Sequence, residues 1–264
     1  MVLQPLFLEE IDDDGVGWIT LTRPEVHNAF NDILIAELTT VLAGFGTDER
    51  VRAVVLEAKG RSFSAGADLK WMQRMTENSE ADNLKDARAL AELMRTLNEL
   101  PRPTVALCQG PTFGGGIGLL ACCDIVIAAE TANFSFSEVR LGLIPSVIGP
   151  YVMAAMGERP ARRYFLTAES FTAPEALRLG LVHQVVPDEA LRDAGNRVLR
   201  ALLRGGPQSQ IEAKDLILAL SGRPIDDDLV EDTAQRIARI RSSEEGREGI
   251  AAFLDKRRPQ WLKS

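Results

Sequence analysis

Short apolar runs and helix-spaced apolar positions alternate along the first two thirds of the chain. Nearly continuous runs of apolar residues predict buried strands at 16–21, 51–56, 104–109, 125–129 and 181–186. Between the first two runs, helical spacing begins at about position 31 and places Leu34, Leu38, Leu42 and Phe45 on one face. From about position 190 the helical pattern continues to the end. This order predicts an α/β body followed by a helical C-terminal part.

Composition narrows the class of protein. The 264 residues carry a formal net charge of −8, so no basic face for nucleic acid is expected. No apolar run approaches the ~18 residues that span a bilayer, and the opening MVLQPLFLEEIDDD lacks a basic leader. The three cysteines have neither zinc-ligand nor disulfide spacing. We therefore expect a cytoplasmic protein with no metal, no membrane association and no nucleic-acid partner.

The stretch 104–146 holds the most informative combination of residues. A buried strand is followed by Gly114-Gly115-Gly116, a helix of small side chains, a second strand and a loop that carries Glu138. Glycine is needed where φ is positive or where another group approaches the main chain closely. Amide N–H groups at such a helix start have no intrahelical partner and can hold an anion or a developing oxyanion. A nearby carboxylate would supply proton transfer.

A second small-residue loop, Ala65-Gly66-Ala67, also follows an apolar strand directly. If the two strands are neighbours in one sheet, both loops lie at the same edge of that sheet. Amides from the two loops would then converge on one carbonyl oxygen, with Glu138 within reach. Two tight turns without any chemistry are the alternative that composition leaves open.

Other kinds of site fit the pattern less well. Gly116 to Ala121 matches the G-x-G-x-x-A dinucleotide pattern, but Glu138 lies well beyond the strand end where the ribose-binding acid is expected. The segment 60–64 is not a G-x-S-x-G nucleophile elbow, and the two histidines, His27 and His183, are expected to be structural. Asp124, at the head of a strand, is expected to accept structural hydrogen bonds.

Three ordered motifs carry a resemblance to a known family. They are SFSAGADLKWM from Ser62, GPTFGGGIGLLACCDI from Gly110 and FSFSEVRLGLIPS from Phe134, followed by LTAESFTAPEALRLGLVHQVV. Together they resemble the enoyl-CoA hydratase/isomerase (crotonase) family over nearly the whole chain. The resemblance implies a spiral of ββα turns over 1–195, with the CoA and oxyanion site, and a helical trimerisation region over 196–264. It also implies a homotrimer or dimer of trimers and an acyl-CoA substrate, with no separate cofactor.

The same resemblance assigns roles to single residues. By motif position, the oxyanion amides resemble those of Ala67 and Gly115, and the acid–base carboxylate resembles Glu138. The segment from Ala65 to Leu69 resembles the wall around the CoA adenine, and three cations resemble phosphate contacts. The implied CoA-binding set is Arg23, Ala65, Gly66, Asp68, Leu69, Lys70 and Lys256. Local cations matter because an acidic protein otherwise repels a polyanionic ligand.

The sequence departs from the family pattern at Gly118. Two-carboxylate hydratases of the family carry GGG-x-E, and Gly118 stands at the position of that glutamate. A single carboxylate suits a 1,3-proton shift, as in the family's Δ3,Δ2-enoyl-CoA isomerases. The motifs nevertheless look most like the branch of hydratases that handles 3-methylglutaconyl-CoA and carboxygeranoyl-type substrates. There the distal carboxylate of the substrate, or water beside Gly118, would replace the missing group, and Arg74 or Arg140 would hold that carboxylate.

We therefore expect an enoyl-CoA hydratase that acts on a 2-enoyl-CoA, with branched or dicarboxylic chains among the candidates. An isomerase that uses Glu138 alone is the alternative, and a non-catalytic acyl-CoA-binding protein is the second alternative. Desolvation is expected to raise the pKa of Glu138, because its apolar neighbours in the sequence are Phe134, Phe136, Leu141 and Leu143. The identity of the acyl chain stays open.

Overall fold

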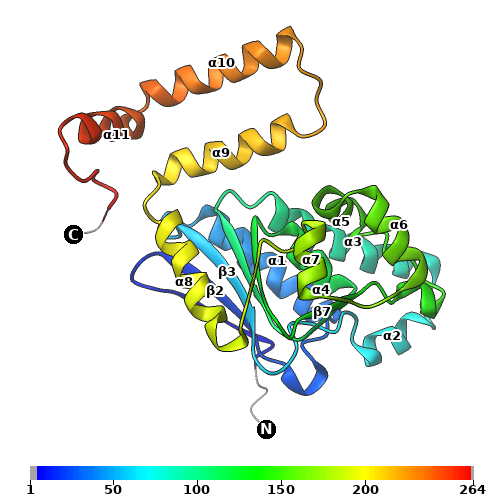
Figure 1. Cartoon of the computed structure of the whole chain (residues 1–264). Helices are drawn as coiled ribbons and strands as arrows, with labels where there is room; N and C mark the ends of the chain where they lie inside the picture. Colours follow the sequence, from blue (N-terminus) through cyan, green and yellow to red (C-terminus); the bar gives the residue numbers. More distant parts are fainter. Residues whose placement is uncertain (1–4, 263–264) are drawn as a thin grey trace.

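A six-stranded sheet forms the middle of the body in the computed structural model, which describes residues 5–262 (Figure 1). Its strand order is β1-β2-β3-β4-β6-β9; β1 is antiparallel to β2 and all later neighbours are parallel. The bounds are β1 Phe7–Ile11, β2 Val16–Leu21, β3 Ala53–Ala58, β4 Thr104–Cys108, β6 Ile125–Ala129 and β9 Gln184–Val186. The expectation about a leader falls partly on residues 1–4, which lie outside the described residues.

A second, smaller sheet has the order β5-β7-β8. β5 is parallel to β7, and β8 is antiparallel to it. Two isolated parallel bridges, Phe30 with Ala67 and Ser64 with Thr112, continue this layer beyond β5. Its strands are β5 Pro111–Phe113, β7 Asn133–Ser135 and β8 Phe171–Thr172. Each inner strand of the main sheet is thus followed by a short extended segment and then a helix, which is the predicted spiral of ββα turns.

Helices fill the connections and make up the C-terminal part. The first long one, α1, begins where Asn31 accepts a hydrogen bond from the Leu34 N–H at 2.8 Å. The α-helices are α1 Asp32–Thr47, α2 Leu69–Met75, α3 Glu80–Asn98, α4 Gly115–Cys122, α5 Gly149–Met156, α6 Glu158–Thr167, α7 Ala173–Leu179, α8 Leu191–Leu202, α9 Pro207–Leu220, α10 Asp227–Ser242 and α11 Glu244–Leu254. The described residues also form the 3₁₀ helices η1 Pro24–Val26, η2 Glu138–Leu141 and η3 Asp188–Ala190.

Helices cover both faces of the main sheet. In β3, Val54 and Leu56 belong to the large core cluster that also contains side chains of α1, α3 and α4. Ala53 and Val55, which point the other way, belong to a second cluster that includes α8. Burial on both faces explains the nearly continuous apolar runs from which these strands were predicted. The predicted apolar face of α1, Leu34, Leu38, Leu42 and Phe45, is buried.

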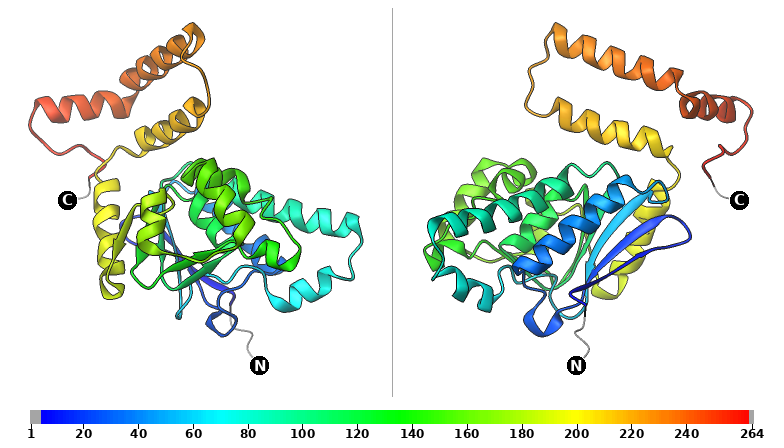
Figure 2. Two further views of the ribbon diagram at one scale, coloured as in Figure 1. Left: turned by 45° about the vertical axis from the view of Figure 1, so that its right-hand side comes forward. Right: turned by 180° about the vertical axis from the view of Figure 1, so that it is seen from behind.

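The helices beyond α8 are arranged differently from the body. α8 packs on the main sheet through Ala194 and Leu199, so the predicted boundary at 195/196 falls inside a helix of the body. The chain leaves the body at Gly205, whose carbonyl accepts a hydrogen bond from Arg52 at 2.8 Å. α9 then runs next to the body, and α10 and α11 stand away from it (Figures 1 and 2).

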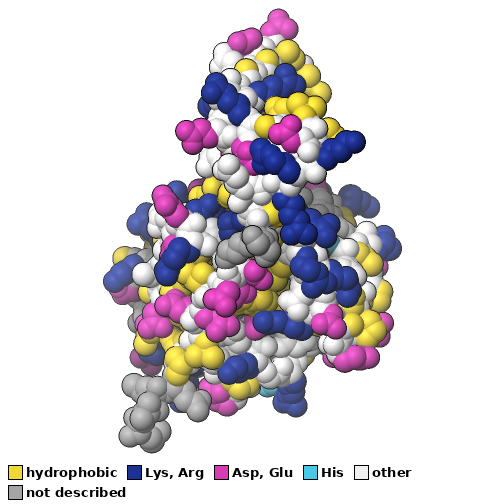
Figure 3. All heavy atoms as spheres, turned by 90° about the vertical axis from the view of Figure 1, so that its left-hand side faces the viewer, with side chains coloured by type: hydrophobic (Ala, Val, Ile, Leu, Met, Phe, Trp, Pro, Cys, Tyr) yellow, Lys and Arg dark blue, Asp and Glu magenta, His cyan; other side chains and the backbone are white. Residues whose placement is uncertain are grey.

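Large apolar side chains are exposed on these last helices and the turn between them. Figure 3 shows this part of the chain projecting from the body. The exposed residues are Ile217, Leu218, Leu220, Ile225, Val230, Ile237, Ile250, Phe253 and Leu254. Such a surface is typical of a contact with another protein chain, and the predicted trimerisation stays a prediction. Over residues 5–262 no helix combines the length and apolarity needed to cross a membrane.

Candidate active site

Neighbouring extended segments bring the two small-residue loops and one carboxylate to the same edge of the second sheet. β3 and β4 are parallel neighbours, as the expected convergence requires. Beyond them, Ser64 pairs with Thr112 of β5, and β5 pairs in turn with β7. Ala67 lies three positions after Ser64, and Gly115 lies three positions after Thr112. Glu138 likewise lies three positions after the end of β7. The register therefore places all three beyond the same end of adjacent segments.

The N–H of Ala67 points away from its neighbour Phe30. Phe30 donates to the Gly66 carbonyl at 2.6 Å, and Asp68 donates to the Phe30 carbonyl at 2.7 Å. In a trans peptide the C=O and N–H point in opposite directions, and the described residues contain no cis peptide. The Ala67 N–H is therefore directed out of this pairing. No hydrogen-bond acceptor for it is found within residues 5–262.

The N–H of Gly115 points out of the start of α4. Gly114 turns the chain into the helix with φ 48° and ψ −118°, a conformation that favours glycine. The Gly114 carbonyl accepts hydrogen bonds from Ile117 and Gly118 at 2.9 and 3.2 Å, so the Gly115 N–H on the same peptide faces the other way. The loop before α2 approaches this turn, since a Cβ built on Gly66 would lie 3.9 Å from the Gly114 Cα.

Glu138 begins η2 and extends its carboxyl group to the glycine turn. A Cβ built on Gly114 would lie 3.0 Å from the Oε1 of Glu138. The other oxygen, Oε2, is buried and has no hydrogen-bond partner among the described residues. Burial raises the pKa of the Glu138 carboxyl, opposed only by a backbone hydrogen bond. The predicted direction of this shift is confirmed, and a buried carboxyl oxygen with no partner is suited to exchange a proton with a bound molecule.

The apolar neighbours expected around Glu138 divide into two groups. Phe134 and Phe136 are fully buried, whereas Leu141 and Leu143 are more than half exposed. Ile144, next along the chain, is 72% exposed. Along the chain, Glu138 therefore lies between buried core residues and an uncovered apolar segment.

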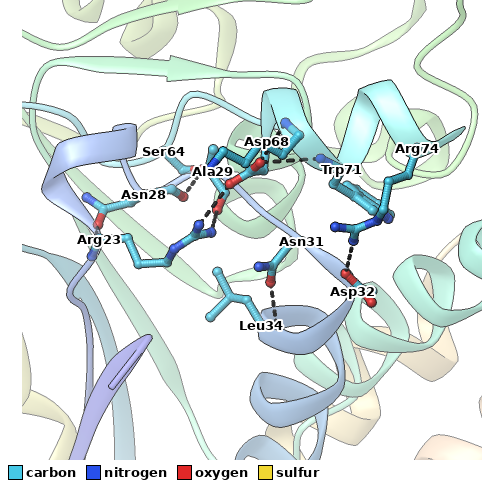
Figure 4. Close-up of polar contacts among 11 residues, drawn as sticks. Arg23, Asn28, Ala29, Asn31, Asp32, Leu34, Ser64, Asp68, Trp71 and Arg74 are labelled. Atoms are coloured by element: carbon cyan, nitrogen blue, oxygen red, sulfur yellow. Dashed lines mark hydrogen bonds and ion pairs between the residues drawn. The ribbon is translucent and has the colours of Figure 1, made fainter. Parts of the chain in front are cut away.

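A buried ion pair holds the loop that carries Ala67 (Figure 4). Arg23 bonds to Asp68 at 2.8 Å and to the Ala29 carbonyl at 2.7 Å; the exposed fractions of the Arg23 and Asp68 side chains are 14% and 8%. Burial by itself would raise the pKa of Asp68, but hydrogen bonds from Arg23 and from the Lys70 and Trp71 amides lower it below its ordinary value. The Arg23 guanidinium is thus engaged within the protein, and its predicted phosphate contact stays a prediction.

Asn28, which the sequence reasoning missed, joins the same loop to η1. Its side-chain amide donates to the Lys59 and Ser62 carbonyls, each at 2.9 Å, and its backbone carbonyl accepts from Ser64 Oγ (Figure 4). The left-handed φ of 52° at Asn28 is one that asparagine tolerates. His27 bonds to Ser62 at 2.9 Å, which agrees with its expected structural role. The only sign of this role in the sequence was an asparagine at a position where a tight turn is expected.

The other predicted CoA contacts lie in two separate places. Ala65 and Gly66 are in the loop next to the glycine turn, with Leu69 and Lys70 exposed at the start of α2. Leu69 is 81% exposed, which is unusual for a leucine. Lys256 follows α11, and α11 and α2 lie on opposite sides of the molecule (Figures 1 and 2). A single chain therefore does not bring Lys256 to the other members of the set.

The space beside Gly118 is filled by apolar side chains. A Cβ built on Gly118 would overlap the Cγ2 of Ile148 and would lie 3.1 Å from the Cε of Met94. Both neighbours are buried. These contacts argue against water beside Gly118 as the replacement for the missing carboxylate, which stays a prediction. The close packing also explains why residue 118 is a glycine, so the G-x-G-x-x-A pattern does not require a dinucleotide-binding site.

The remaining polar candidates have structural roles. Asp124 accepts hydrogen bonds from Thr104 and from Lys214 of α9, which confirms its predicted part as a structural acceptor. His183 accepts from the Val126 N–H at 3.0 Å. No group of three or more potential metal ligands occurs within the described part of the chain.

Comparison with known proteins identifies the family. Residues 12–264 match the family described as enoyl-CoA hydratase/isomerase. The crystal structure of an enoyl-CoA hydratase from Shewanella pealeana is 46% identical, with a TM-score of 0.94 over 97% of this chain and 96% of that one. The 2,3-dehydroadipyl-CoA hydratase of Escherichia coli is 31% identical over 92% of this chain and 93% of its own length. A trans-2-decenoyl-[acyl-carrier-protein] isomerase of Streptococcus mutans is 30% identical over 94% and 95%.

These relatives cover almost the whole chain, and their solved structures share its arrangement of strands and helices. The motifs, the two outward-facing amides beside a buried carboxyl group and the comparisons agree. The chain therefore belongs to the enoyl-CoA hydratase/isomerase (crotonase) family.

Proposed function

We propose that this protein hydrates the double bond of a 2-enoyl-CoA thioester. The thioester carbonyl accepts hydrogen bonds from the amides of Ala67 and Gly115, which stabilise the enolate as negative charge develops on its oxygen. Donors of this kind are typically worth about 3 kcal/mol each in the transition state. The positive end of α4 adds to this stabilisation.

Glu138 serves as the acid–base group in this scheme. Its carboxylate takes a proton from water as the hydroxide adds to C3, and the protonated acid then returns a proton to C2 of the enolate. The two transfers balance, and the enzyme ends in its starting state. Because burial raises its pKa, the Glu138 carboxylate is a better proton acceptor than an ordinary glutamate.

The observation that carries this proposal is the buried Oε2 of Glu138 beside the glycine turn. Among the described residues it has no partner, whereas the neighbouring Asp68 carboxylate has several. A buried polar atom without a partner costs free energy, typically about 1–3 kcal/mol. Its retention is explained if the substrate or water supplies the partner.

Double-bond isomerisation is the second candidate, and the packing at Gly118 favours it. A 1,3-proton shift needs one base that removes a proton from one carbon and returns it to another, which Glu138 alone can do. Ile148 occupies the space into which an acidic side chain at position 118 of α4 would extend. A relative named as a trans-2-decenoyl-[acyl-carrier-protein] isomerase supports the same reading.

A dicarboxylic or branched acyl chain is the substrate class we propose within the hydratase reading. One relative is named as a hydratase of 2,3-dehydroadipyl-CoA, a dicarboxylic thioester. Arg140 is the better candidate for a distal carboxylate, because it is exposed and no ion pair to it is found in residues 5–262. Arg74, the other candidate, is already paired with Asp32 at 2.6 Å.

Association into a homotrimer or a dimer of trimers through α9, α10 and α11 completes the proposal. The exposed apolar side chains on these helices support it. Ala65, Gly66, Asp68, Leu69 and Lys70 are the proposed CoA contacts near the site, with Arg23 and Lys256 as further candidates. Coenzyme A enters as part of the substrate, and a cytoplasmic location remains our expectation.

The test is an assay of the pure protein with three substrates: crotonyl-CoA, 3-methylglutaconyl-CoA and a 3-enoyl-CoA. Uptake of water by either 2-enoyl thioester supports the hydratase, and a preference for 3-methylglutaconyl-CoA supports the dicarboxylic class. Movement of the double bond without water supports the isomerase. Saturable binding with no product from any of the three would overturn catalysis and leave an acyl-CoA-binding protein.

A further inference from the structure

Ile148 lies against the bare backbone of Gly118 in the interior next to the proposed site. A Cβ built on Gly118 would overlap the Cγ2 of Ile148 and lie 3.0 Å from its Cβ. Ile148 is 3% exposed and stands immediately before α5. Even alanine at 118 therefore requires Ile148 to move, and the two positions are coupled by packing.

Position 118 lies on the reacting side of α4. It follows Gly115 by three residues, and residues three apart in a helix lie on the same face. A side chain at 118 would thus start one helical turn from the proposed oxyanion amide. In this protein, the branched aliphatic group of Ile148 and the Cε of Met94 occupy that space instead.

We propose that Ile148 is a specificity-determining residue, which closes the 118 position to any acid–base side chain and restricts the enzyme to reactions that need one protein carboxylate. This inference rests on the proposed function. An isoleucine neither donates nor accepts a proton, and its surroundings exclude water. Substrates such as crotonyl-CoA, which bring no polar group of their own, are then handled poorly. Substrates that carry a second carboxylate, or that need only a proton shift, are favoured.

The packing half of the inference is tested by a double-mutant cycle on thermal stability. We expect Gly118→Ala to lower Tm by roughly 3–10 °C in the wild-type background, because the added methyl group overpacks the site. In the Ile148→Ala background the same change should cost less than half as much, since Cγ2 is gone. Ile148→Val is the matched control: valine keeps a γ-methyl group on a branched Cβ and should give little relief.

The specificity half is tested by installing the missing group. Gly118→Glu combined with Ile148→Ala should hydrate crotonyl-CoA with kcat/KM at least ~10-fold above Ile148→Ala alone, a fraction of what a placed acid–base group contributes. Gly118→Gln with Ile148→Ala has the same shape and no carboxylate, and should show no gain. If the glutamate double variant does not fold, Gly118→Asp with Ile148→Ala replaces it.

The outcomes separate failure of the role proposed for Ile148 from failure of the proposed function. Equal costs of Gly118→Ala in both backgrounds, or folded double variants with no gain on crotonyl-CoA, overturn the role of Ile148. Failure of the proposed function looks different: the wild type turns over none of the three substrates, while the stability coupling between positions 118 and 148 persists.

Discussion

Two loops at one edge of the second sheet each carry a carboxylate, Asp68 and Glu138, and the two differ in their hydrogen bonds and in the direction of their pKa shifts. Asp68 is surrounded by donors: Arg23 and two backbone amides hold it, and its pKa is lowered. Glu138 is desolvated, its Oε2 has no partner among residues 5–262, and its pKa is raised. A carboxylate whose hydrogen bonds are all made within the protein holds a loop in place. One that is left without a partner is available to a substrate, and the following predictions test that division.

The largest effect is expected at Glu138. Glu138→Gln keeps the shape of the side chain but cannot exchange a proton, so turnover should fall by about 10²-fold or more while acyl-CoA binding is kept. Steady-state kinetics and calorimetric titration with acyl-CoA measure the two quantities. Glu130→Gln, at an exposed glutamate eight positions earlier, is the matched control and should behave as wild type. Retained turnover in Glu138→Gln would remove this residue from the mechanism.

Removing the partner of Asp68 should act on stability first. Arg23→Met leaves a mostly buried carboxylate without its cation, which costs about 3 kcal/mol and lowers Tm by roughly 6–12 °C. Turnover should fall as well, because the loop that orients Ala67 loosens. Arg74→Met breaks an exposed pair with Asp32 and should change Tm by less than about 2 °C. Similar losses of Tm in both variants would contradict the structural role of the buried pair.

The glycine turn should be sensitive to a single methyl group. Gly114→Ala forces a side chain into a conformation with positive φ and brings it 3.0 Å from Glu138 Oε1, a strain of about 1–3 kcal/mol. We expect kcat to fall by roughly 10-fold or more, with a smaller change in KM, since the Gly115 amide and the acid are both displaced. Gly44→Ala, in α1 with no atom near the added Cβ, is the control and should be neutral or slightly stabilising. Unchanged kcat in Gly114→Ala would argue against an oxyanion site here.

The smallest effect is a pH dependence of stability, with opposite signs for the two carboxylates. The folded protein binds a proton at Glu138 more tightly than the unfolded chain, so this group lowers stability as pH rises through its raised pKa. Asp68, whose pKa is lowered, adds stability above its unfolded pKa that is lost as pH falls through the folded one. Glu138→Gln should therefore raise Tm by about 1–4 °C at pH 7.5 and not at pH 4. A Tm gain that is the same at both pH values would contradict the raised pKa.

The inner strands of the main sheet and the glycine helix could be predicted because their signals are local. The edge strand β1, which is mostly exposed, was not predicted. Strands buried on both faces are continuous apolar runs, and β2 and β6 lie where the sequence placed them. β5, β7 and β8 were missed because segments of two or three residues carry no measurable period. The same segments set the register that brings Ala67, Gly115 and Glu138 together. From the sequence, their meeting could be predicted only on the condition that two strands are neighbours in one sheet, with support from the resemblance.

The contacts that hold the site were beyond prediction for a different reason. Arg23 pairs with a residue 45 positions away, and Ile148 packs against Gly118, 30 positions earlier in the chain. Neither pairing leaves a trace in local periodicity or composition. The sequence therefore indicated neither the pairing of Arg23 with Asp68 nor the contact of Ile148 with Gly118.

The isolated bridge between Phe30 and Ala67 fixes the direction of the Ala67 amide. The number of residues in the loop from Ser64 to Ala67 therefore matters as much as which residues they are. Peptide groups alternate direction along an extended segment, so one residue inserted between Ser64 and Ala67 would rotate the Ala67 amide towards the core. Every small side chain could be kept and the proposed oxyanion-binding geometry would still be lost. In this loop, evolution and engineering are free to exchange side chains of similar size but not to change the residue count.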